Sequence, residues 1–129
     1  AVQNAEGSWI KARQNLEIQR SQNISDIATA ERQLDFAQRD LKKYLEGDYP
    51  QLLQAAEDAI LLANEDLKRA QDQLKWSRDL EGRGFLTRTE LEADELAHKR
   101  AEIKVEQALR DKALLVDYDF PRERKRLEA

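Results

Sequence analysis

The sequence contains residues able to do acid–base, metal or phosphate chemistry. Their spacing, however, is not typical of a catalytic, metal-binding or phosphate-binding site. His98 is the only histidine, and it lies among charged residues rather than in a Glu-x-x-His metal pattern. Residues 82–84, Gly-Arg-Gly, are too short for a phosphate loop and are not followed by a Lys-Ser pair. The carboxylates mostly occupy exposed helical positions with Lys or Arg nearby. We therefore expect no enzyme, no metal and no cofactor.

Composition points to long helices with narrow apolar seams. Of the 129 residues, 37% are charged and only 6% are aromatic, a mixture typical of coiled coils. The 22 basic and 26 acidic residues are interspersed, which argues against a nucleic-acid partner. The basic cluster "RERKR" at 122–126 is interpreted as a solvated helix start, with contact to phosphate or anionic lipid as the alternative. Cysteine is absent, and no apolar run reaches the ~20 residues of a membrane span.

Apolar periodicity divides the chain into helical segments of one hairpin domain over residues 1–129. The first segment, 1–46, carries a heptad seam in its second half, made of Ile27, Ala30, Leu34, Ala37, Leu41 and Tyr44. Gly47 is expected to end it, and Asp48 to cap the next helix. That helix, 50–81, has an unbroken seam of Leu53, Ala56, Ile60, Ala63, Leu67, Ala70 and Leu74.

The second arm of the hairpin is predicted over 88–116, after a turn at 82–87. It carries two apolar stripes, more than one partner helix requires, so it is expected to touch a second neighbour as well. One stripe is Ala93, Leu96, Ile103 and Leu114; the other is Leu91, Ala101, Val105, Ala108 and Leu115. A further helix is expected to start within 121–129.

Two Asp-aromatic-Pro elements, at 48–50 and 119–121, lie at nearly equal distances from the turn. In an antiparallel hairpin they fall at the same height, either as a matched break or as two unrelated helix boundaries. The first helix then has two alternatives. It either continues the arm beyond residues 47–50, or it folds back along the hairpin as a third helix. The fold class is in both cases all-α, a long antiparallel coiled-coil hairpin.

The turn carries clear helix signals. Thr87 and Glu90 form a predicted capping box at the start of the second arm, and Leu86 and Leu91 occupy the two positions of a hydrophobic staple. Glycines at 82 and 84 free the backbone to reverse. Phe85 is left with two interpretations. It either folds over the open end of the hairpin as a lid, or it forms an exposed apolar tip with Leu86 that docks into a partner.

The stretch "LKWSRDLEGRGFLTRTELEADELAHKRAEIKVEQA" (74–108) resembles the hairpin tip of periplasmic adaptor proteins, the membrane fusion proteins of the HlyD type. The tip of that family carries an arginine, a leucine four residues later and a capping serine seven after that, preceded by an aliphatic residue. Leu80, Leu86 and Thr87 match the last three positions. Trp76 stands at the arginine position, which is a departure from the pattern.

The resemblance implies an adaptor hairpin inserted between two halves of a lipoyl-like domain, excised here from a longer protein. Its partners are then a TolC-like outer-membrane channel, an inner-membrane transporter reached through the missing domains, and neighbouring adaptor protomers. The resemblance further implies work in efflux or type I secretion, in the periplasm, with the full protein anchored to the inner membrane. The expected docking residues are Leu80, Arg83, Phe85, Leu86 and Thr87, supported by Trp76, Gly82, Gly84, Glu90 and Leu91.

Two alternatives come from other classes of protein. One is the coiled-coil arm of an enzyme, such as the tRNA-gripping hairpin of a seryl-tRNA synthetase, which should show a basic stripe along one face; the sequence has none. The other is a scaffold coiled coil, in which the tip is incidental.

Overall fold

The computed structural model describes residues 2–129, which are helical except at one turn and the last residue. The elements are α1 (Val2–Lys43), the π-helical segment η1 (Tyr44–Asp48), α2 (Tyr49–Gly82), α3 (Arg88–Leu114), the π-helical segment η2 (Leu115–Asp119) and α4 (Phe120–Glu128). They join into two long helices of 81 and 41 residues, and the described part of the chain has no strand, so the predicted all-α hairpin is confirmed. The chain forms two compact units, residues 1–42 and 43–129.

The first unit consists of α1 alone. No side chain of this helix is buried, and its predicted seam residues Ile27 and Leu34 are exposed. The heptad pattern of α1 predicts a partner helix, but no face of α1 is buried within the described residues.

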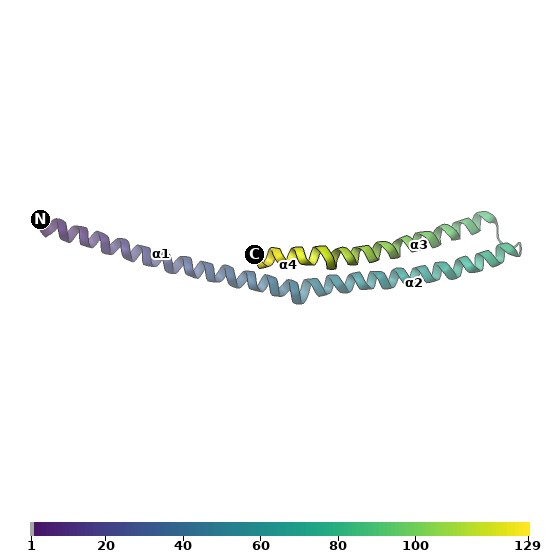
Figure 1. Cartoon of the computed structure of the whole chain (residues 1–129), viewed down its shortest axis with the longest axis horizontal. Coiled ribbons are helices and arrows are strands. Elements are labelled where there is room, and N and C mark those ends of the chain that lie inside the picture. The colour runs from purple at the N-terminus through teal and green to yellow at the C-terminus, as the bar shows by residue number, and fades with distance from the viewer. Residues whose placement is uncertain (1) are drawn as a thin grey trace. The chain divides into compact units, whose positions relative to one another are not determined.

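The second unit is built on the antiparallel pair of α2 and α3, joined by the turn near residue 85 (Figure 1). The predicted seam of α2 is its inward face. Its residues are all buried or half-buried, and they are Leu53, Ala56, Ile60, Ala63, Leu67, Ala70 and Leu74. Large and small residues alternate along this face, so that the backbones can approach where the alanines stand.

Only one of the two predicted stripes of α3 faces α2. Its residues are buried or half-buried, and they are Leu91, Ala101, Val105, Ala108 and Leu115. The other stripe stays exposed, including Leu96, Ile103 and Leu114. Alanines at 101 and 108 repeat the alternation of α2, which accounts for the choice of this face.

Two polar contacts cross the seam between α2 and α3. The hydroxyl of Ser77, the most buried side chain of the described residues, donates a hydrogen bond to the carboxylate of Asp94. Nearer the other end, Lys112 Nζ lies 3.5 Å from Glu57 Oε1. A buried polar group requires its partner, so the Ser77–Asp94 pair favours a single register of the two helices.

The predicted break at Gly47 and the predicted cap at Asp48 are wrong. Asp48 has helical dihedral angles (φ −66°, ψ −48°) and makes no capping hydrogen bond with its side chain. The backbone instead passes through η1 as a wider helical turn, and η2 does the same where the fourth helix was expected to begin anew. The glycine and aspartate permit a helix end without forcing one, and packing of Tyr44 and Tyr49 against Phe120 keeps the helix intact.

The helices of residues 2–129 hold no segment both long and apolar enough to cross a membrane.

Candidate docking tip

The tip of the hairpin begins with a Schellman motif that ends α2. The amide of Phe85 donates to the carbonyl of Leu80 (2.9 Å), and the amide of Gly84 donates to the carbonyl of Glu81 (3.0 Å). These are the two hydrogen bonds of a Schellman motif. The motif needs a residue in the left-handed conformation directly after the C-cap of the helix. Gly84 supplies it, with φ +80°.

Replacing Gly84 with alanine is expected to lower the free energy of unfolding by about 1–2 kcal/mol, because a Cβ atom is strained at positive φ. Gly82→Ala is the matched control. Residue 82 is the last of α2, without a positive φ and with open space around its Cβ position, so alanine there should be neutral or stabilise by up to ~1 kcal/mol. Thermal unfolding followed by circular dichroism measures both. Equal effects of the two substitutions would contradict the assigned backbone.

The start of α3 is fixed by the predicted capping box, which the structure confirms. The amide of Glu90 donates to Thr87 Oγ1 (3.2 Å), and the amide of Thr87 donates to Glu90 Oε2 (3.4 Å). Leu86 and Leu91, on either side of the cap, are both half-buried, as a hydrophobic staple requires. The two helix ends of the tip are thus held by its own residues.

Phe85 lies between these two caps and is 77% exposed, so it does not close the end of the hairpin as a lid. Its neighbour Arg83 pairs with Asp79 on its own helix, with Nη2 3.4 Å from Oδ2. Both groups of that pair are more than half exposed, which makes it a weak interaction.

Trp76 is the second open aromatic residue near the tip, 68% exposed on α2. It lines a shallow depression with Asp72, Lys75 and Asp79. Leu80, in contrast, is half-buried. The exposed apolar surface near the tip therefore comes mainly from the two aromatic residues, whereas Leu80 and Leu86 are half-buried.

The described residues form no candidate metal site. His98 is paired with Glu102 one turn away on α3 (Nδ1–Oε1 3.2 Å), and no group of three or more His, Asp or Glu side chains within residues 2–129 is arranged to hold a metal ion.

Comparison with known proteins gives no match. No family model fits the chain, and neither the curated proteins nor the solved structures contain a significant relative.

The role of Phe85 in ending α2 is the feature of the tip that pattern reasoning missed. The signal was in the sequence, since a glycine followed by an apolar residue, with a leucine four positions before that glycine, is the usual pattern of a Schellman motif. The turn residues thus stabilise the helix end and also place an aromatic ring in solvent.

Proposed function

We propose that this chain is the hairpin of a periplasmic adaptor that links an inner-membrane transporter to an outer-membrane channel in efflux or type I secretion. It does no chemistry. Its tip docks on a TolC-like channel, and neighbouring protomers pack side by side. The protein is then anchored to the inner membrane through domains outside this chain.

The observation that carries this proposal is the exposed ring of Phe85 on a preformed tip. The Schellman motif and the capping box are both formed within the tip, so the backbone that carries the ring is positioned without any partner. Aromatic side chains that project from rigid elements are frequent anchors of protein interfaces. A tip-to-tip contact requires such a group at the point where the hairpin reverses.

A second observation supports the side-by-side packing of protomers. The stripe of α3 that does not face α2 leaves Leu96, Ile103 and Leu114 exposed on one helix. Apolar residues that recur along one face of a helix indicate a further neighbour. A second copy of the hairpin would cover this stripe.

Phe85→Ser in the complete adaptor is expected to weaken binding to the channel about 30-fold or more, as loss of an aromatic anchor does. The fold should survive, because the ring is open to solvent. Phe36→Ser is the matched control, since Phe36 is also an exposed phenylalanine but lies in α1. Binding is measured with the purified channel, and circular dichroism checks the helix content of both variants.

Crosslinking gives an independent readout. The chain has no cysteine, so Arg83→Cys introduces a unique thiol beside the ring. It should crosslink to the channel, whereas Phe36→Cys should not. Unchanged binding of Phe85→Ser, together with no crosslink from position 83, would exclude the docking role and favour a scaffold coiled coil.

A further inference from the structure

The two π-helical segments of the second unit share one sequence pattern. Each ends in aspartate and is followed by an aromatic residue and a proline, Tyr49-Pro50 after η1 and Phe120-Pro121 after η2. Each is closed by a hydrogen bond that spans five residues. The amide of Tyr49 donates to the carbonyl of Tyr44, and the amide of Phe120 donates to the carbonyl of Leu115. The two arms of the hairpin therefore contain the same irregularity.

Proline accounts for the wider turn in both helices. In a regular α-helix, its ring meets the carbonyl four residues earlier, and it has no N–H to donate. A π-turn moves that carbonyl away by placing one more residue in the turn. Each segment thus relieves the clash of its own proline, at Pro50 or Pro121, while the helix continues.

The additional residue of each π-turn also changes the spacing of the residues on the inward face of its helix. Seam positions elsewhere are three or four residues apart, as a heptad requires. Across the π-helical segments the step is five, from Tyr44 to Tyr49 and from Leu115 to Phe120, and all four residues are buried or half-buried. The bulges therefore keep the seam continuous past the prolines.

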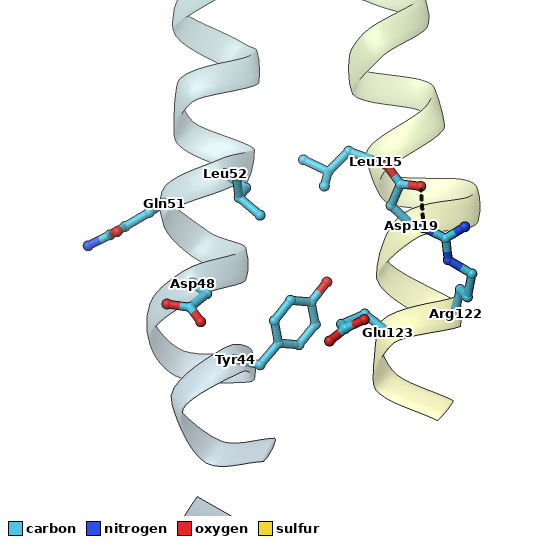
Figure 2. Close-up of a pocket in the computed structure, with 8 residues that line it drawn as sticks. All are labelled: Tyr44, Asp48, Gln51, Leu52, Leu115, Asp119, Arg122 and Glu123. Carbon is cyan, nitrogen blue, oxygen red and sulfur yellow. Dashed lines mark ion pairs between the residues drawn. The ribbon is translucent and has the colours of Figure 1, made fainter. Parts of the chain in front are cut away.

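An aromatic cluster of Tyr44 and of the two residues that directly follow the segments, Tyr49 and Phe120, joins the two helices across the hairpin. The rings of Tyr49 and Phe120 are stacked with centroids 4.0 Å apart, and Tyr44 lies 6.1 Å from Phe120 and 6.3 Å from Tyr49. Figure 2 shows the ring of Tyr44 between the two helices, beside Glu123. Burial, followed by the negative charge of Glu123, raises the pKa of the Tyr44 hydroxyl. The two bulges thus lie at one level, and the rings in and directly after them connect the two helices.

We propose that η1 and η2 form one hinge of the hairpin, whose two halves open together. Each helix lacks a backbone donor at its proline, so both have their weakest hydrogen bonding at the same level. Two helices packed along a seam can bend without separating only if both bend at the same height along the hairpin. The ring stack transmits opening of one segment to the other. This hinge does not depend on the partner of the tip.

Hydrogen exchange on the intact chain tests the hinge. Amides of residues 44–49 and 115–120 should exchange faster than those one or two turns closer to the tip in α2 and α3. Tyr49→Ala should accelerate exchange about tenfold in both segments, including 115–120 on the other helix, because it removes the stack. Phe120→Ala should act on residues 44–49 in the same way.

Leu53→Ala is the matched control, the next seam residue of α2 toward the tip and likewise half-buried. It should weaken the pairing without a selective effect on residues 115–120. If Tyr49→Ala unfolds the hairpin, Tyr49→Leu keeps an apolar side chain and removes only the ring. The hinge is refuted if both segments exchange as slowly as their neighbours, or if a substitution in one segment accelerates that segment alone.

Discussion

Leu74→Ala will lower the free energy of unfolding of the hairpin by about 2–4 kcal/mol, because it empties a leucine site closed by both helices. Leu74 is 5% exposed, the least exposed leucine of the described seam, one turn before Ser77. Its neighbours are fixed by helical backbone on both sides, so the space left by the side chain cannot collapse easily. Denaturant-induced unfolding followed by circular dichroism measures the effect.

Leu62→Ala provides the control for the same chemical change on the same helix. Leu62 is 65% exposed, and its loss should change the stability by no more than about 0.5 kcal/mol. If both variants lost the same stability, the seam would not be the surface that holds α2 and α3 together, and the register of the hairpin would have to be reassigned.

Ser77→Asp will destabilise the hairpin more strongly still, by about 3–5 kcal/mol at neutral pH. The serine is 1% exposed, and its side chain is hydrogen-bonded to a carboxylate, that of Asp94. The substitution places a second negative charge in a buried position beside the first, and a buried charge without an opposite partner costs this much. Unfolding curves at pH 7 measure the loss.

Acid should restore part of that loss, because one proton shared between two adjacent carboxylates removes the repulsion. The variant is therefore expected to gain stability relative to the unsubstituted chain as the pH falls from 7 to about 4. Ser77→Ala is the control. It removes only a hydrogen bond, should cost about 1 kcal/mol, and should show no such recovery. A Ser77→Asp hairpin as stable as the parent would mean that Ser77 and Asp94 do not face each other.

Sequence reasoning succeeded where periodicity and capping chemistry agree. The seam of α2 and the capping box at Thr87 were both predictable, because each depends on a few neighbouring residues. Periodicity alone did not decide which of the two stripes of α3 faces α2, since both have helical spacing. That choice depends on fitting large residues against small ones across the pair.

The π-helical segments were not predicted, for a physical reason. Gly47, Asp48 and Pro50 are each a usual signal for a helix boundary, and together they favour a break. Packing of aromatic rings between the two arms outweighs those local preferences, and it becomes visible only when both arms are considered together. The five-residue spacing between Tyr44 and Tyr49 was the signal of this packing in the sequence.

The internal capping of the tip has a consequence for how its specificity can change. Since the two caps of the tip are formed by the backbone of residues 80–85 and by Thr87 and Glu90, the side chains of residues 83 and 85 can be exchanged for others while the loop keeps its shape. A partner then meets a main chain that needs little ordering on contact, which lowers the entropic cost of association. Such a loop can acquire a new recognition preference by single substitutions, with the scaffold left unchanged.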